Sequence, residues 1–144
     1  MRIHTGIVRT FLAALGAAST VLAGCAGMSG PETRVMLSGM SEVPAVNSTA
    51  SGDASIWVNK DKTLSGSVRT RGIDARGAYI YVGLSGTNGP IAVRLTQSGD
   101  GSWSVPAGAK FTHGQYEAFL GGETYVSVLS AAYPDGEIRG QLRP

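Results

Sequence analysis

The stretch Tyr125-Val-Ser-Val-Leu-Ser-Ala-Ala-Tyr-Pro-Asp-Gly-Glu-Ile-Arg-Gly-Gln-Leu142 decides the fold of this chain. On both sides of Pro134-Asp135-Gly136, side chains of two kinds alternate, and this period of two is typical of strands. The three central residues have turn chemistry, because proline presets φ and glycine accepts positive φ. The stretch therefore predicts strand, turn and strand, with Ile138 and Leu142 on one face and Arg139 on the other.

The rest of the chain repeats this kind of signal. Short alternating runs are separated by Gly, Asn, Asp and Pro, and no segment has the pattern of an amphipathic helix. Further strands are expected at 34–37, 54–58, 64–68, 78–84, 90–95 and 102–105, an extended edge segment at 42–46, and turns at 59–62 and 97–101. The interpretation is an all-β, antiparallel Greek-key sandwich or barrel in a single domain.

The beginning of the chain has the features of an export signal. Arg2 and Arg9 supply positive charge, and the apolar run at 11–22 is too short to span a bilayer comfortably. Leu-Ala-Gly-Cys at 22–25 resembles the lipobox of bacterial lipoproteins, whose cysteine is lipidated and becomes the first mature residue. The domain prediction is a lipoprotein signal peptide at 1–24, a lipidated tether at 25–33 and a β domain at 34–144.

Lipidation of Cys25 would make the membrane the first partner of this protein. Acyl chains such as palmitate contribute about 0.8 kcal/mol for each buried methylene, so several chains anchor a domain firmly. Ala26 stands where lipoproteins kept in the inner membrane carry aspartate. We therefore expect a bacterial cell-envelope protein, at the outer membrane, facing the periplasm or the surface. Cys25 is the only cysteine, so no intramolecular disulfide is expected.

The charge of the mature chain argues against a nucleic-acid partner. The 12 basic residues include Arg2 and Arg9, so ten remain after removal of the signal, against ten acidic residues. The mature domain is formally neutral and has no basic stripe that could hold a phosphate backbone.

Three blocks in order resemble the chordin-type domain, written CHRD. They are Leu37-Ser38-Gly39 with Glu-Val-Pro-Ala-Val at 42–46, Gly-Thr-Asn-Gly-Pro at 86–90, and the stretch from Tyr125 to Leu142. The resemblance covers about 34–143. In animals, copies of this domain occur in a secreted antagonist of growth factors. The resemblance thus implies an all-β binding or scaffolding module rather than an enzyme.

One departure from the family bears on metal binding. Many members carry His-Ile-His where this chain has Tyr79-Ile80-Tyr81, and a further histidine at the position of Leu129. These positions would converge on one sheet face. Neutral phenols and aliphatic side chains do not bind transition metals readily, so no metal and no cofactor other than the lipid is expected. A copper- or zinc-binding or redox-related envelope domain is the alternative.

No motif indicates catalysis. His113 is the only histidine after the signal and is expected as an exposed turn residue. There is no Gly-x-Ser-x-Gly motif to support a serine triad. No catalytic residue is assigned, although a hydrolase with paired carboxylates stays open, because the sequence does not give their separation.

The remaining candidates are charged and aromatic residues. Arg139 is expected to pair with Glu42 or Glu137 across neighbouring strands and so to fix their register. Trp57, Tyr79 and Tyr81 lie off the main hydrophobic face. Packing in a second sheet is the favoured interpretation of these aromatics, and contact with a protein or glycan partner is the alternative. The functional prediction is an envelope-anchored, non-enzymatic binding or structural module.

Overall fold

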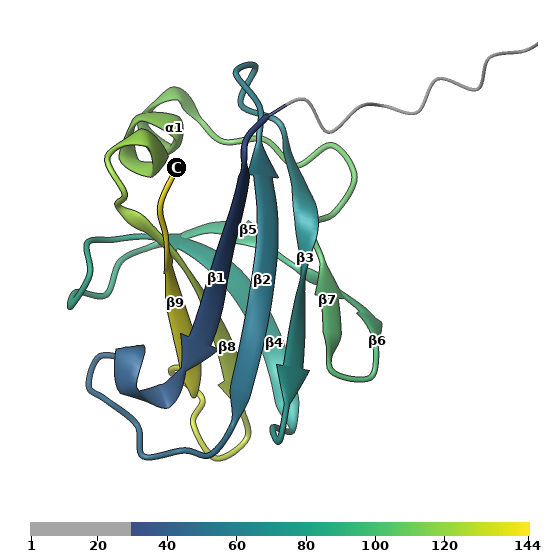
Figure 1. Ribbon diagram of the computed structural model, residues 1–144, viewed down its shortest axis with the longest axis vertical. Helices are drawn as coiled ribbons and strands as arrows, with labels where there is room; N and C mark the ends of the chain where they lie inside the picture. The colour runs from purple at the N-terminus through teal and green to yellow at the C-terminus, as the bar shows by residue number, and fades with distance from the viewer. Residues whose placement is uncertain (1–29) are drawn as a thin grey trace, which may run out of the picture.

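The computed structural model describes residues 30–144. This part of the chain contains nine strands, a 3-10 helix and one α-helix. The strands hydrogen-bond in the order β5-β4-β8-β9-β1-β2-β3-β7-β6, and their pairings are antiparallel (Figure 1). The elements are β1 (Glu32–Ser38), η1 (Gly39–Ser41), β2 (Ser51–Val58), β3 (Leu64–Arg71), β4 (Ala75–Val82), β5 (Ile91–Arg94), β6 (Thr96–Gly99), β7 (Ser102–Ser104), α1 (His113–Leu120), β8 (Thr124–Ser130) and β9 (Ile138–Leu142).

The sheet curls until its two ends nearly meet. β5 and β6 stand at opposite ends of the strand order, yet only Leu95 separates them in the sequence. Leu95 is buried, and its backbone N–H donates to the Ala78 carbonyl of β4 over 3.0 Å. The result is a nearly closed antiparallel barrel, which confirms the predicted all-β, single-domain fold.

The stretch from Tyr125 to Leu142 forms β8, a turn and β9, as predicted. Val128 pairs with Ile138 across the two strands, and Ile138 and Leu142 point into the core. The strands expected at 54–58 and 64–68, with the turn expected between them, form a hairpin, because β2 pairs with β3 from Val58 opposite Leu64 onward. The alternation of side chains thus predicts which residues face the interior.

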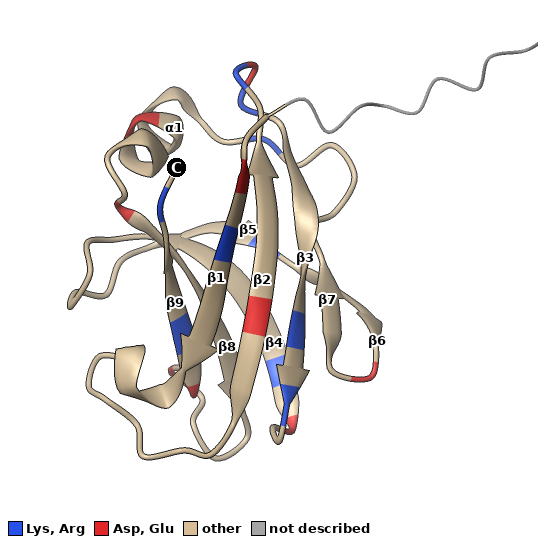
Figure 2. Ribbon diagram, in the orientation of Figure 1, with Lys and Arg blue, Asp and Glu red and all other residues tan. Residues whose placement is uncertain are grey.

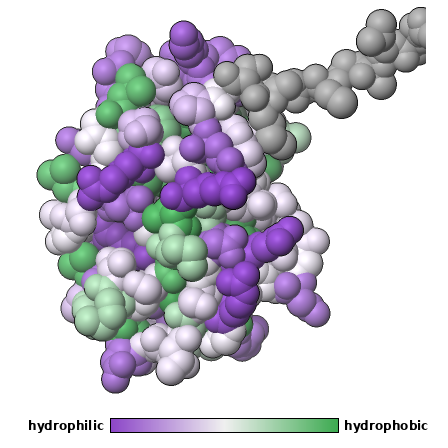
Figure 3. Space-filling view, viewed as in Figure 1, coloured by the Kyte–Doolittle hydropathy of each residue, from purple (hydrophilic) through white to green (hydrophobic). Residues whose placement is uncertain are grey.

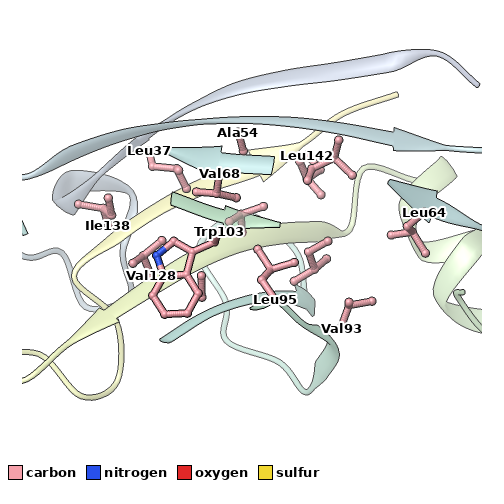
Figure 4. Close-up of a cluster of buried hydrophobic side chains, with 14 of the residues drawn as sticks. Leu37, Ala54, Leu64, Val68, Val93, Leu95, Trp103, Val128, Ile138 and Leu142 are labelled. Atoms are coloured by element: carbon pink, nitrogen blue, oxygen red, sulfur yellow. The ribbon is translucent and has the colours of Figure 1, made fainter. Parts of the chain in front are cut away.

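The hydrophobic core consists mainly of aliphatic side chains, with Trp103, Phe111 and Phe119 as its buried aromatic members. Figure 4 shows side chains from opposite walls pointing toward one another around Trp103. Full burial of one such aliphatic side chain contributes about 1.5–3 kcal/mol, so packing accounts for the stability of the domain. The side chains with at most 1% exposure include Leu37, Ala54, Ile56, Val68, Ile80, Val126, Val128, Ile138 and Leu142.

The sequence pattern does not predict α1. The helix begins with a capping box, in which the Thr112 side chain accepts from the Gln115 N–H and the Gln115 side chain accepts from the Thr112 N–H. Phe119 is its one buried residue and packs against Phe111, with 6.2 Å between ring centroids. A helix of eight residues with one buried side chain shows little hydrophobic periodicity. This explains why the sequence pattern does not predict α1.

Two further segments differ from expectation. Residues 97–101 were expected as a turn, but Thr96–Gly99 forms β6 and pairs with β7. The 42–46 segment is not an edge strand, because it follows η1 as an irregular connection whose Val46 N–H donates back to the Gly39 carbonyl. Both segments are polar or contain proline, so local alternation does not decide their pairing.

The outer face of β1, β2 and β3 is charged but carries no surface of one sign. Figure 2 shows basic and acidic residues interleaved along these strands, and Figure 3 shows hydrophilic residues around smaller apolar areas. Arg71 Nη2 lies 3.2 Å from Asp53 Oδ1, and both side chains are largely exposed. Exposed pairs of this kind contribute at most about 1 kcal/mol each, so this face adds little to stability.

Candidate functional site

Two connections cover the outer face of β8 and β9. One joins β1 to β2 and contains η1 and Glu42, and the other joins β4 to β5 and contains Asn88 (Figure 1). They are tied together, since Asn88 Nδ2 donates to the Val43 carbonyl over 2.7 Å. Gln141 on β9 holds the second connection to the barrel, because its Nε2 donates to the Gly83 carbonyl over 2.8 Å. Side-chain hydrogen bonds thus fix both connections.

Arg139 lies at the centre of this arrangement. Its side chain projects from β9 away from the barrel interior, yet the residue is only 1% exposed, because the connections cover it. Nη1 donates to Asn88 Oδ1 over 3.2 Å, and Nη2 donates to the Leu84 carbonyl over 3.0 Å and to Gln141 Oε1 over 3.3 Å. Burial lowers the pKa of the guanidinium, and its hydrogen bonds satisfy the buried charge.

Three tyrosine rings continue from the guanidinium and form what we call the tyrosine stack, Tyr125, Tyr81 and Tyr79. Arg139 Cζ lies 3.4 Å from the centroid of the Tyr125 ring. Tyr125 and Tyr81 are nearly parallel, at 4.9 Å and 9°, and Tyr81 and Tyr79 are tilted, at 5.9 Å and 57°. Arg94 closes the far end, 5.0 Å from the centroid of Tyr79. Each such contact contributes on the order of 1 kcal/mol.

The sheet register builds this stack. Tyr81 of β4 stands opposite Tyr125 of β8, and Tyr79 stands opposite Arg94 of β5. All four side chains lie on the outer face, because β4 turns Ala78 and Ile80 inward. Burial raises the pKa of Tyr81 to about 12, with further contributions from the neighbouring tyrosines and from Glu42, so its hydroxyl stays protonated at neutral pH.

Glu42 places a carboxyl group beside the stack. The residue is only 7% exposed, and its Oε1 accepts a hydrogen bond from Ser127 Oγ over 2.6 Å. The turn before β9 lies against it, since a Cβ built on Gly136 would stand 2.7 Å from Glu42 Oε1. Burial raises the pKa of Glu42, against the opposing effects of the Ser127 hydrogen bond, the Arg139 charge and the Val43 backbone.

The ion pair expected between Arg139 and Glu42 or Glu137 does not form. Glu137 accepts from Ser48 Oγ over 2.6 Å instead, and Glu42 accepts from Ser127. The guanidinium lies over the Tyr125 ring and directs its donors to the acceptors of the β4–β5 connection. Within residues 30–144 the ion pairs are Arg34–Glu32, Arg71–Asp53 and Arg76–Asp74, all on the surface.

A hollow of about 460 Å³ opens beside the stack, and we call it the Glu42 hollow. It lies between the β1–β2 connection, the outer face of β4 and β8, and the turn before β9. Its size falls within the range of about 300–1,000 Å³ that is typical of small-molecule sites. Its lining includes Glu42, Pro44, Tyr81, Ser127, Leu129 and Asp135.

The structure brings together some of the aromatic candidates and not others. Tyr79 and Tyr81 are half-buried and pack in the stack, and Tyr81 and Leu129 both line the Glu42 hollow. Trp57 is also half-buried, but it lies on β2 between Glu32 of β1 and Ser65 of β3. β8, β9 and β1 separate its strand from β4, so Trp57 belongs to a different face of the barrel.

The described residues hold no three side chains of His, Cys, Asp and Glu close enough together to bind a metal ion. On the outer face of β4 and β8, Tyr79 packs against Tyr81, and Tyr81 and Leu129 line the Glu42 hollow. His113 is exposed, but it begins α1 rather than lying in a turn.

The expected lipidation site, Cys25, and the signal peptide lie outside the described residues. Within residues 30–144, no helix reaches the length and hydropathy that crossing a bilayer requires. β1 begins at Glu32, shortly before the expected domain start at 34.

Four residues of this site were not singled out from the sequence: Tyr125, Ser127, Asn88 and Gln141. A signal exists for two of them, because Tyr125 and Ser127 occupy the outward positions of the β8 alternation. Asn88 and Gln141 lie within the CHRD-like blocks, but nothing local shows that their amides meet Arg139. Only the fold of the connections brings these groups together.

Comparison with known proteins identifies the family of this chain. The model of the CHRD domain family matches residues 33–142, which is most of the chain. No curated protein and no solved structure matches it. CHRD is not a known enzyme family, and the function of the domain is unclear. On the extent of this match, the chain belongs to the CHRD domain family.

Proposed function

We propose that this protein is an envelope-anchored lipoprotein whose CHRD domain serves as a non-enzymatic binding module for a protein or glycan of the envelope. The observation that carries the binding role is the Glu42 hollow, an open space of about 460 Å³ with aromatic, apolar and carboxyl walls. Pockets that combine apolar walls with a few fixed polar groups are typical of recognition sites.

The walls of the hollow are held in place by hydrogen bonds between the protein's own groups. Asn88 links the two connections, Arg139 holds the β4–β5 connection, and Ser127 orients Glu42. A site that is already ordered loses little conformational entropy on binding, which favours affinity. The polar side chains of this network form hydrogen bonds with other groups of the protein. Their arrangement therefore suits ligand recognition better than catalysis.

Anchoring rests on the resemblance of Leu-Ala-Gly-Cys at 22–25 to the lipobox. The test is metabolic labelling of cells that express the full chain with a clickable palmitate analogue. Labelling and recovery in the membrane fraction are expected for the native chain, and both are expected to disappear in Cys25→Ser. Equal labelling of the two chains would exclude lipidation at this cysteine.

Binding is tested on the full chain purified in detergent and labelled with ¹⁵N. Panels of envelope peptides, sugars and amines are added, and backbone amide shifts are recorded. The expected result is a saturable shift at Asn88, Gly89 and Ser127, which border the hollow, with none at Asn59 and Lys60 in the β2–β3 turn. A binding role for this hollow would be contradicted if no compound shifted the amides that border the hollow. Equal shifts at these amides and at those of the β2–β3 turn would also contradict it.

A further inference from the structure

The charged side chains that line the Glu42 hollow, Glu42 and Asp135, are both acidic. Its lining contains no Lys, Arg or His. The Glu42 side chain is buried, whereas Asp135 is exposed on the turn before β9. The hollow therefore combines a carboxyl at its base with another at its rim and is complementary to a cation.

Arg139 does not fill this role. Its donors go to Asn88, to the Leu84 carbonyl and to Gln141. Its guanidinium borders a second hollow, of about 320 Å³, which shares Glu42 and Val43 with the first. Glu42 thus lies between two hollows. Arg139 lines one of them, and no cationic side chain lines the other. A buried carboxylate without an ion pair is stabilised when a cation binds next to it.

The other walls favour a cation on a slender apolar stem. Pro44, Leu129 and Pro134 contribute apolar surface, while the Tyr81 side chain brings a neutral hydroxyl group. The faces of Tyr125 are already occupied, one by Arg139 and the other by Tyr81. The carboxylates, rather than an aromatic cage, are therefore the groups that would select the ligand.

We propose that the Glu42 hollow binds a primary ammonium group on an unbranched aliphatic stem, the chemistry of a lysine side chain on a partner protein. Glu42 and Asp135 supply the counter-charges, and Pro44, Leu129 and Pro134 contact the stem. This inference rests on the proposed binding function and narrows it to one ligand class. An amino sugar carries the same ammonium group but presents hydroxyl groups where these walls are apolar.

The test is calorimetric titration of the full chain in detergent at neutral pH. The probes are Nα-acetyl-lysine methylamide, its neutral isostere Nα-acetyl-norleucine methylamide, and glucosamine. We expect the lysine derivative to bind at least about tenfold more tightly than either of the others, because they lack the charge or the stem. Equal binding of the lysine and norleucine derivatives would overturn the proposal, and tighter binding of glucosamine would overturn the assignment of an aliphatic stem.

Variants locate the site. Glu42→Gln and Asp135→Asn each remove one counter-charge, and we expect each to weaken binding of the lysine derivative about tenfold. Asp74→Asn is the matched control, because Asp74 is an exposed carboxylate before β4 that does not line the hollow. Should Glu42→Gln fail to fold, Asp135→Asn decides, since its side chain is on the surface. Unchanged affinity in Asp135→Asn would then overturn the proposal.

Acidification gives an independent readout. The titratable groups that face the Glu42 carboxyl are Arg139 on β9, Tyr81 on β4, Tyr125 on β8 and Asp135 in the turn. Protonation of Glu42 removes its negative charge, so affinity is expected to fall as the pH is lowered. The amide shifts separate this inference from the proposed function. If amines do not change the backbone amide shifts of Asn88 and Ser127 but another probe does, the ammonium proposal is wrong and the proposed binding function is retained.

Discussion

The guanidinium carbon of Arg139 lies 3.4 Å from the centroid of the Tyr125 ring, with Tyr81 on the other face of that ring. This contact explains why a buried arginine in a neutral domain needs no carboxylate. The ring stabilises the charge from one side, and the acceptors around it take the N–H groups. Arg139 therefore connects β9 to the β4–β5 connection.

Replacing Arg139 by Met is expected to lower the free energy of unfolding by about 3 kcal/mol. The variant leaves the Leu84 carbonyl and the Asn88 side chain without their donor in a covered site and removes the contact with Tyr125. Urea denaturation followed by circular dichroism measures the effect. Arg143→Met, at an exposed position, is the control and is expected to stay within about 0.5 kcal/mol. Equal stability of the two variants would refute this role.

Gly136→Ala is expected to destabilise the domain by about 3 kcal/mol. Gly136 has φ of +135°, and a Cβ there would stand 2.7 Å from both Glu42 Oε1 and Ser127 Oγ. Gly86→Ala is the matched control, because Gly86 also has positive φ, +81°, but nothing lies within 4 Å of its Cβ position. We expect about 1 kcal/mol there. Thermal unfolding compares the two variants, and similar melting temperatures would show that the turn does not press on Glu42.

The contribution of Glu42 to stability is expected to depend on pH. Burial raises its pKa in the folded state above the ordinary 4.5, so the folded protein binds the proton more tightly than the unfolded chain. This contribution is present in full below that ordinary value and is lost as the pH rises through the folded-state pKa. The unfolding free energy of Glu42→Gln minus that of the native chain should thus be more positive at about pH 7.5, where the native carboxyl is charged in a desolvated site, than at about pH 4.

Urea denaturation at the two pH values measures that difference. Glu117→Gln on α1, which removes an exposed carboxyl, is the control and is expected to change stability by less than about 0.5 kcal/mol at both. A variant-minus-native difference that is equal at both pH values, or more positive at about pH 4, would show that the carboxyl is not held in a desolvated site.

The barrel could be predicted from the sequence because it depends on alternation. Ile138 and Leu142 face inward at period two, and that period continues through Val126 and Val128. The site depends on contacts between distant residues, which alternation does not encode. Asn88 and Leu84 reach Arg139 from more than fifty positions away, so the sequence suggests a nearby carboxylate instead.

Addition of copper or zinc to the full chain in detergent is expected to leave its melting temperature unchanged. The outer face of β4 and β8 presents Tyr79, Tyr81 and Leu129 rather than imidazole or thiolate groups, and residues 30–144 contain no cluster of metal-ligand side chains. Differential scanning fluorimetry with measurement of bound metal checks this expectation. A stoichiometric metal with a clear rise in melting temperature would favour the redox-related alternative.

The neighbouring positions of β1 and β9 constrain how this domain folds. Ser38 pairs with Arg139, which lies 101 positions later in the sequence. The barrel therefore cannot close until β1 has paired with β9. Topologies dominated by such distant pairings fold slowly, in about milliseconds to seconds, because loop closure precedes the stabilising contacts. A chain emerging N-terminus first cannot pair β1 with β9 until Ile138–Leu142 has been synthesised. Arg139 and the site around it are therefore among the last features to form.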